Sequence, residues 1–150
     1  MLSWQTLLTD TGLALAAFAL ALPIGWERHE ADRPAGLRTF PLVGLSSCAF
    51  LLLGLRAFPG SPDAQARVLQ GLMTGIGFIG GGAILKDGSV GHVRGIATAT
   101  SIWSTGAIGA AVALGRFELG VVLSLANFLI LRWMRPLAGA DAAVDRNLDG

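Results

Sequence analysis

Apolar residues in this chain are gathered into long blocks that charged residues separate. The uncharged blocks cover residues 11–26, 39–55, 68–85 and 95–115, and a shorter apolar block covers 119–131. Crossing the hydrocarbon core of a bilayer takes about 20 predominantly apolar residues. Each block is close to that length, and the last reaches it when the Arg132 side chain extends to the headgroups. The pattern therefore predicts an all-α, polytopic membrane protein with about five transmembrane helices.

Positive charge is distributed unequally between the two sides of these predicted helices. With five spans, one side receives the loop after the first helix, the loop after the third and the C-terminus, which together carry eight Lys and Arg residues against three on the other side. The richer side faces the cytoplasm, which predicts N-terminus out and C-terminus in. Trp4 and Trp26 are 22 residues apart, or about 33 Å along a helix, which matches the two membrane interfaces.

Composition supports this organisation. Hydrophobic residues make up 53% of the 150 residues and charged residues only 14%, whereas about a quarter of a typical soluble domain is charged. Residues 1–136 are expected to form one transmembrane domain, and residues 137–150 a disordered cytoplasmic tail. Residues 55–67 read LRAFPGSPDAQAR, which predicts an external loop rich in turns. The net charge of +1 offers no clustered basic face for nucleic acid.

A glycine-rich stretch lies inside the third block. Residues 75–80 read GIGFIG, which matches the spacing of a dinucleotide-binding fingerprint. That fingerprint needs a preceding strand and an acidic residue about 20 positions later, and neither is present, so we exclude a nucleotide site. Small residues four apart instead let membrane helices approach closely. The predicted packing residues are Gly71, Gly75, Gly77, Gly80, Gly81 and Gly82.

The run Gly80–Gly82 contains more glycine than packing requires. Two interpretations follow from it. In the first, the third helix is continuous and its glycines admit a neighbouring helix. In the second, the helix breaks at these glycines and lines a polar cavity.

The densest cluster of charge lies between the first two blocks. Glu27 follows Trp26 at the membrane edge, and Arg38 immediately precedes the second block. Charges at that depth are costly unless paired, and such groups are often functional, so Glu27, Arg28 and Arg38 are candidate functional residues; the alternative is a solvated loop of mixed charge. Asp87 is a further candidate. A weak candidate Mg²⁺ site is Glu27, Glu30 and Asp87, because Mg²⁺ takes few carboxylates.

The fourth block carries a polar stripe. Its members are spaced at i, i+4, i+7 and i+11, which is one helical face: Arg94, Thr98, Ser101 and Thr105. Trp103 lies near mid-membrane, and Asn127 in the fifth block could join the stripe. Hydroxyls in membrane helices often bond their own i−4 carbonyls, and the alternative is a surface that faces a cavity or a partner. The sequence shows no catalytic constellation and no cofactor motif, so we expect no enzyme activity and no cofactor.

Four blocks of sequence occur in a characteristic order. They read GWER at 25–28, PAGLRTFPLVG at 34–44, RVLQG followed by GIGFIGGGAIL at 67–85, and VRGIATATSIWSTGAIG at 93–109. In these blocks the chain resembles the MgtC/SapB family from about residue 7 to 134. The resemblance implies a multi-pass bacterial inner-membrane protein linked to growth at low magnesium, to acid adaptation and to virulence. It also implies a non-catalytic regulator that binds and restrains the F-type ATP synthase.

The resemblance also suggests which positions matter. It carries over Glu27, Arg28, Arg38, Arg94, Trp103 and the glycines of 75–82. The chain has Phe40 where members of the family often have histidine, and we expect it to lack the cytoplasmic C-terminal domain of longer members. Beside the regulator hypothesis stands a second one, a transporter or channel for Mg²⁺ or another small ion or solute. The bilayer is an expected partner, and a homo-oligomer stays open.

Overall fold

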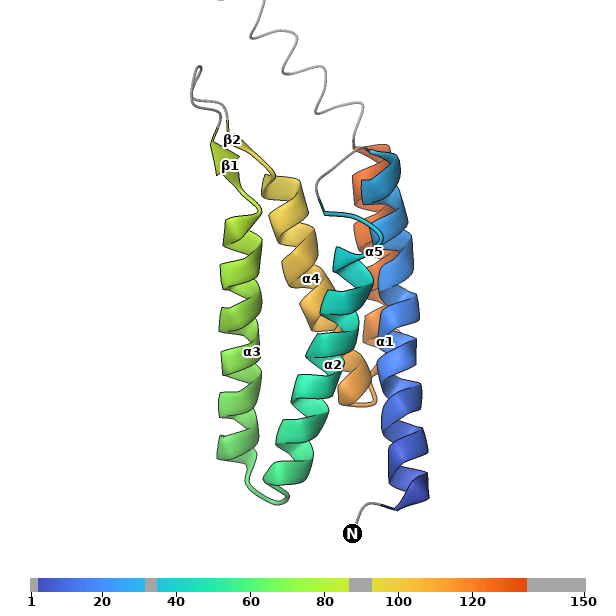
Figure 1. The fold of residues 1–150 in the computed structure, drawn as a ribbon, viewed down its shortest axis with the longest axis vertical. Helices are drawn as coiled ribbons and strands as arrows, with labels where there is room; N and C mark the ends of the chain where they lie inside the picture. The colour runs from blue at the N-terminus through green and yellow to red at the C-terminus, as the bar shows by residue number, and fades with distance from the viewer. Residues whose placement is uncertain (1–2, 32–34, 87–92, 135–150) are drawn as a thin grey trace, which may run out of the picture.

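The computed structural model describes residues 3–31, 35–86 and 93–134. Its five helices are α1 (Trp4–Glu30), α2 (Thr39–Ala57), α3 (Pro62–Gly82), α4 (Ile96–Ala113) and α5 (Phe117–Trp133). Between α3 and α4, the two-residue strands β1 (Leu85–Lys86) and β2 (Val93–Arg94) pair antiparallel. Consecutive helices alternate in direction, so that α1 and α5 run parallel to each other (Figure 1). The predicted all-α fold with five helices is confirmed.

Three of these helices are long and apolar enough to cross a membrane by length and composition, namely α1, α2 and α4. The 17 residues of α5 make it shorter than these three, and α3 carries Gln65, Arg67 and Gln70 in its first half. Large apolar side chains are exposed on all five helices. Apolar surface of this extent fits a protein whose surroundings are lipid.

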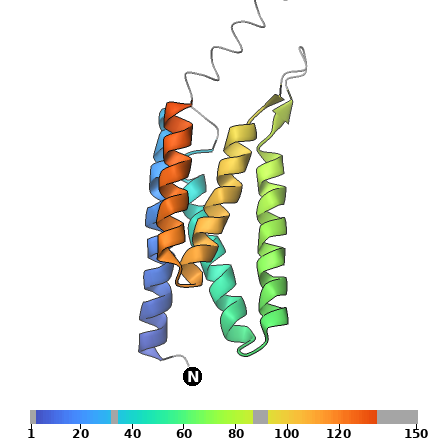
Figure 2. The ribbon, with the colours of Figure 1, turned by 180° about the vertical axis from the view of Figure 1, so that it is seen from behind.

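Helix α4 is the centre of the bundle. It contacts each of the other four helices, and Figures 1 and 2 show it between α3 on one side and α1 and α5 on the other. Twelve of its 18 residues are buried, most of them Gly, Ala, Ser or Thr. Small side chains allow several helices to lie close to one backbone, which supplies van der Waals contact where lipid removes the hydrophobic drive.

Helix α3 stands at the edge of the bundle, with α4 and α2 as its main neighbours (Figure 2). Only Ile76 and Gly80 of its 21 residues are buried. The core lies mainly between the other four helices. Phe40 is fully buried there in a cluster that includes Ile24 and Ile102, and Ile76 is the residue that α3 contributes to it. Phenylalanine suits this apolar environment, where a histidine ring would need a hydrogen-bond partner.

Of the two interpretations of Gly80–Gly82, the structure supports the continuous helix. Helix α3 continues through these residues to Gly82. The chain then leaves the helix through two i→i−3 bonds, from the Ala83 amide to the Gly80 carbonyl (3.0 Å) and from the Ile84 amide to the Gly81 carbonyl (3.1 Å). A tightened last turn of this kind is common at helix ends. The glycine run therefore terminates the helix rather than interrupting it.

Two further expectations need correction. Most of the predicted loop 55–67 is helical, because α2 extends to Ala57 and α3 begins at Pro62; proline is well suited to the first helical position, where no amide hydrogen is required. Arg94 lies in β2 and not on the face of α4. Gly95 separates the two elements with a positive φ of 95°, a left-handed conformation that interrupts the helix pattern. Asp87 and the predicted tail 137–150 lie outside the described residues.

Candidate functional site

An ion pair is buried near the C-terminal end of α1. Arg28 donates from Nε to Oε2 of Glu27 at 2.7 Å, and the exposed fractions of their side chains are 7% and 0%. Glycines bring the backbone of the next segment onto this end of α1. A Cβ at Gly25 would lie 3.2 Å from the Leu37 Cα, and one at Gly36 would lie 3.3 Å from the Cα of His29. The glycines of the GWER and AGLR stretches thus let the following segment cover α1 beside the pair.

This geometry assigns partners to the predicted charged residues. Glu27 pairs with its neighbour Arg28, whereas Arg38 is exposed and has no ion pair among the described residues. The second carboxylate oxygen of Glu27, Oε1, is buried without a hydrogen-bond partner in the described part of the chain. A buried carboxylate with only one of its two oxygens hydrogen-bonded is costly. Glu27 therefore depends on its ion pair with Arg28.

The hydroxyls of the predicted stripe on α4 are buried. Thr98, Ser101 and Thr105 are exposed by 5% or less. Ser101 donates to the Ala97 carbonyl (2.7 Å) and Thr105 to the Ser101 carbonyl (2.8 Å). These i−4 bonds satisfy the hydroxyls within their own helix. Ser101 and Thr105 therefore need no ligand to satisfy their hydroxyl groups.

Asn127 of α5 faces this stripe. Its Oδ1 lies 3.1 Å from the Ser101 hydroxyl, which also faces the Ala97 carbonyl. A hydroxyl has a single proton, so it serves only one of these two acceptors at a time. The Asn127 Nδ2 is buried and has no partner within the described ranges. The interior thus holds a donor and an acceptor, Asn127 Nδ2 and Glu27 Oε1, that the surrounding side chains leave unsatisfied.

One interhelical bond fixes the relative height of these groups. Ser124 of α5 donates to the Leu20 carbonyl of α1 at 2.6 Å. Glu27 lies seven residues beyond Leu20, or about 10 Å, and Asn127 lies three residues beyond Ser124, or about 4.5 Å. Because α1 and α5 run parallel (Figure 1), the ion pair sits about one turn beyond the amide. Nothing in the sequence singled out Ser124, whose role depends on which helix becomes its neighbour.

The predicted packing glycines of α3 divide into two groups. A Cβ at Gly80 would lie 3.1 Å from the Ala99 carbonyl oxygen of α4, so Gly80 is in close contact. A Cβ at any of the other five would meet nothing within 4 Å in the described structure: Gly71, Gly75, Gly77, Gly81 and Gly82. Their predicted role in helix packing thus has no counterpart inside this chain, and stays a prediction about a second molecule.

Several closely packed glycines other than Gly80 were not predicted from the sequence. A Cβ at Gly109 of α4 would lie 2.4 Å from the Gly44 carbonyl oxygen of α2, and one at Gly44 would lie 2.9 Å from the Ala17 carbonyl oxygen of α1. A Cβ at Gly106 would lie 2.1 Å from Cδ1 of Ile76. One feature of the sequence could have indicated these contacts. Small residues recur at three- and four-residue spacing in 106–113, within the longest uncharged block.

The exposed side of α3 carries a defined stripe, which we call the outer face. It consists of Thr74, Gly77, Phe78 and Gly81, at i, i+3, i+4 and i+7. Phe78 has an exposed fraction of 85%, the largest among the exposed large apolar side chains. The Thr74 hydroxyl donates to the Gln70 carbonyl at 2.9 Å. The outer face therefore presents an aromatic side chain between two glycines.

The remaining candidates are dispersed. Trp103 is half-exposed and borders an apolar hollow between α3, α4 and α5. The Glu30 carboxylate accepts from Trp26 Nε1 and from Arg132 Nη1, each at 2.8 Å. In the described ranges no group of three or more His, Cys, Asp or Glu residues could hold a metal ion. The weak Mg²⁺ site of Glu27, Glu30 and Asp87 is not tested, because Asp87 lies outside these ranges.

Comparison with known proteins places this bundle in a family. The family model described as MgtC family matches residues 14–140. The chain belongs to the MgtC family. The match begins within α1 and extends past the end of α5. No solved structure matches the chain.

Three relatives illustrate how much of a family member this chain covers. Protein SrpB of Synechococcus elongatus is 35% identical over 133 residues, which is 82% of this chain and 73% of SrpB. Protein MgtC of Salmonella typhimurium is 37% identical over 120 residues, 77% of this chain and 50% of MgtC. YhiD of Escherichia coli is 36% identical over 131 residues, 83% of this chain and 60% of YhiD. The alignments thus cover only half to three quarters of these relatives.

Proposed function

We propose that this MgtC-family protein is a non-catalytic regulator in the bacterial inner membrane, with its N-terminus out and its C-terminus in. Its outer face on α3 binds a transmembrane helix of a larger complex, and the F-type ATP synthase is the candidate complex that the sequence resemblance implies. The observation that carries the proposal is the asymmetry of the bundle. Helix α4 is enclosed by its neighbours, whereas on α3 Phe78 is exposed and a Cβ at Gly77 or Gly81 would meet nothing within 4 Å among the described residues.

The chemistry of the outer face suits a helix as its ligand. Two glycines four residues apart let a second backbone approach closely, and the Phe78 ring offers a large contact area between them. The Thr74 hydroxyl already donates to the Gln70 carbonyl, so a docked helix would not bury it without a hydrogen-bond partner. Such a surface recognises shape and apolar contact, and it needs neither a cofactor nor a reactive side chain.

The proposal is tested by ATP-driven proton pumping in inverted membrane vesicles. Expression of the native chain should reduce pumping, and Gly81→Leu should restore it, because the added side chain occupies the space between the helices. The matched control is Gly12→Leu in α1, where an added Cβ also meets nothing within 4 Å; this variant should inhibit as the native chain does. Unchanged pumping at saturating expression of the native chain rejects the ATP synthase as the partner.

A physical test of contact complements the pumping assay. A photo-crosslinking phenylalanine analogue at position 78 should form a crosslink to a membrane subunit of the ATP synthase. The same analogue at position 18, where Phe18 is an exposed residue of α1, should not. Equal crosslinking from both positions indicates collision in the membrane and contradicts docking on the outer face.

A second function, transport of Mg²⁺ or another small ion, is favoured by one observation. Glu27 Oε1 and Asn127 Nδ2 are polar, buried and unpartnered in the described structure, and intramembrane groups of this kind often mark ion pathways. YhiD is named as a candidate magnesium transporter. Against this, the hollow between α2 and α3 and the hollow between α3, α4 and α5 are lined mainly by apolar side chains.

Transport is tested with purified protein in liposomes that contain a Mg²⁺-sensitive or pH-sensitive dye. A path through the interior is supported if Glu27→Gln alters the flux and the control Glu118→Gln, at an exposed residue of α5, preserves it. Absence of flux for Mg²⁺, protons and monovalent ions counts against a transporter and leaves the regulator as the function.

A further inference from the structure

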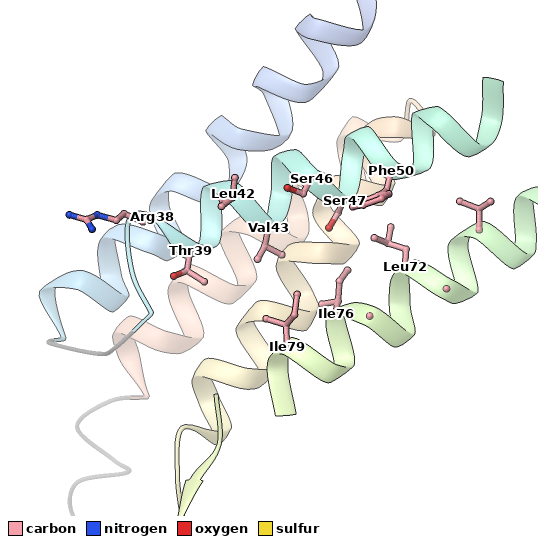
Figure 3. A pocket seen from close by; sticks show the side chains of 13 residues that line it. Arg38, Thr39, Leu42, Val43, Ser46, Ser47, Phe50, Leu72, Ile76 and Ile79 are labelled. Carbon is pink, nitrogen blue, oxygen red and sulfur yellow. The ribbon is translucent and has the colours of Figure 1, made fainter. Parts of the chain in front are cut away.

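A groove of about 690 Å³ separates α2 from α3. Each helix contributes a stripe at i, i+4, i+7 and i+11, which keeps the lining side chains on one face of that helix. On α2 the stripe is Thr39, Val43, Ser46 and Phe50, and on α3 it is Val68, Leu72, Gly75 and Ile79. Figure 3 shows the two helices facing each other across these side chains. The lining is mainly apolar, and the glycines at 71 and 75 widen it.

The groove has the length of one membrane leaflet. It extends along α2 from Arg38 to Phe50, which is 12 residues or about 18 Å. Half of the hydrocarbon core is about 15 Å thick. A lipid whose headgroup lies beside Arg38 can therefore place a full acyl chain along the groove.

The lining and the charged end of the groove together favour a phospholipid over a helix. Most of the lining side chains are apolar, and Arg38 stands at one end. An apolar transmembrane helix would cover the lining but offers no anion to Arg38, whereas an anionic phospholipid supplies both an acyl chain and a phosphate.

Positive charge lies at one end of the groove. Arg38 is exposed and has no ion pair among residues 3–31, 35–86 and 93–134. Figure 3 shows its guanidinium at the end of the groove, directed away from the apolar lining. The N-terminus of α2 lies at the same place and has no acidic residue in its first turn, so the helix dipole adds to the positive potential.

We propose that the α2–α3 groove binds one acyl chain of an anionic phospholipid, whose phosphate is held by Arg38. Guanidinium groups form strong charge-assisted hydrogen bonds with phosphate. This end of the groove is on the side that we predict to be cytoplasmic, where anionic lipids give the membrane its negative surface potential. The bound lipid fills the space between α3 and the core of the bundle.

Native mass spectrometry of the full chain, released from detergent, tests the proposal. The native protein should retain dioleoyl phosphatidylglycerol more strongly than dioleoyl phosphatidylcholine. Arg38→Gln should weaken retention of phosphatidylglycerol about fivefold, the effect of one interfacial basic side chain, and Arg38→Lys should preserve the preference. Gly75→Leu fills the groove and should abolish retention of both lipids, whereas the matched variant Gly77→Leu, on the outer face, should leave both unchanged.

Measurements on the native chain alone keep the proposal open to rejection even if a variant fails to fold. Dioleoyl phosphatidylglycerol should protect the protein against thermal unfolding, and neither inorganic phosphate nor dibutyryl phosphatidylglycerol should do so. Equal retention of the two dioleoyl lipids overturns the proposal, as does equal protection by inorganic phosphate. A lipid-free dimer as the dominant species also overturns it, because a second copy then covers the groove.

Discussion

Helices α3 and α4 are similar in length and both contain glycine, six residues in α3 and two in α4, yet one is the most exposed helix of the bundle and the other the most buried. Twelve of 18 residues are buried in α4, whereas two of 21 are buried in α3. The glycines of α4 touch neighbouring backbone and side chains, and most glycines of α3 face open space in the described structure. The comparison shows that a glycine pattern permits close packing, but the position of the helix decides whether a neighbour is present.

The difference has a physical origin in the sequences of the two helices. The buried positions of α4 lie on all sides of the helix, and small side chains among them let four neighbours approach. Gln65, Arg67 and Gln70 reduce the apolar character of the first half of α3, and its buried residues Ile76 and Gly80 form a single narrow contact. α3 is therefore the element with surface left for a ligand, whether a partner helix on the outer face or a lipid in the groove.

We expect the largest effect from a substitution that adds a side chain where α4 is in contact with the backbone of α2. In Gly109→Ala, the new Cβ would lie 2.4 Å from the Gly44 carbonyl oxygen and 2.7 Å from the Cβ of Ser47. Because the obstacle is backbone, α2 and α4 must separate, and we expect the free energy of unfolding to fall by about 3 kcal/mol. Chemical unfolding in detergent, followed by circular dichroism, measures this loss.

The matched control for that substitution is Gly77→Ala in α3. A Cβ at this position meets nothing within 4 Å in the described structure, so the change adds only helix propensity. We expect the free energy of unfolding to stay constant or to rise by up to about 1 kcal/mol. If Gly77→Ala lowered the free energy of unfolding as much as Gly109→Ala, α3 would have to be enclosed in solution, which would contradict the difference in burial between the two helices.

An intermediate effect is expected where α3 attaches to α4. Ile76 is the one large apolar side chain of α3 that is buried, and it packs directly on Gly106. Ile76→Ala should lower the free energy of unfolding by about 2 kcal/mol, the lower end of the range for such truncations, because one side of the site is the open groove. Hydrogen exchange should accelerate in residues 72–82 and remain slow in α4.

The control for this experiment is Ile79→Ala, three residues further along α3. Ile79 is 52% exposed, so its truncation should cost less than about 0.5 kcal/mol. Equal acceleration of exchange in α3 and α4 after Ile76→Ala would contradict a peripheral α3, because it would mean that the two helices unfold as one unit.

Much of the helical framework was predictable from the sequence, because the spacing of charges reflects the thickness of a bilayer. The ends of the elements were not. Pro62 and Gly95 are residues that either terminate or begin a helix, and the choice depends on hydrogen bonds formed elsewhere. The strands and the position of Arg94 were missed for this reason. The spacing of Arg94 from Thr98 fits one helical face, and the sequence does not show that the helix begins only after Gly95.

The candidate site was predictable in its residue types and not in its contacts. That Glu27 needs a partner follows from the cost of a buried charge, but its pairing with Arg28 rather than Arg38 depends on how the segment after α1 folds over the glycines. The glycines of α3 matched a packing motif, whereas Gly44 and Gly109 gained their importance from helices that are distant in sequence. The burial of a helix therefore depends on its neighbours in the bundle as well as on its own sequence.

The smallest expected effect compares one hydrogen bond in two environments. The Thr105 hydroxyl of α4 donates to the Ser101 carbonyl at 2.8 Å, and the Thr74 hydroxyl of α3 donates to the Gln70 carbonyl at 2.9 Å. Thr105 is fully buried and Thr74 is exposed. Thr105→Val should lower the free energy of unfolding by about 1 kcal/mol, because it removes a buried hydrogen bond and forces a methyl group into a closed site.

Thr74→Val makes the same chemical change on the outer face, where the new methyl group faces the surroundings of the protein. We expect its effect on the free energy of unfolding to lie within about 0.5 kcal/mol of zero, measured by the same chemical unfolding. Both variants replace threonine by valine and remove the same type of hydrogen bond. The difference between their effects on the free energy of unfolding therefore reports the contribution of burial. A loss at Thr74 as large as at Thr105 would mean that the outer face is covered in the isolated protein, and a self-associated state would then have to be sought by varying the protein-to-detergent ratio.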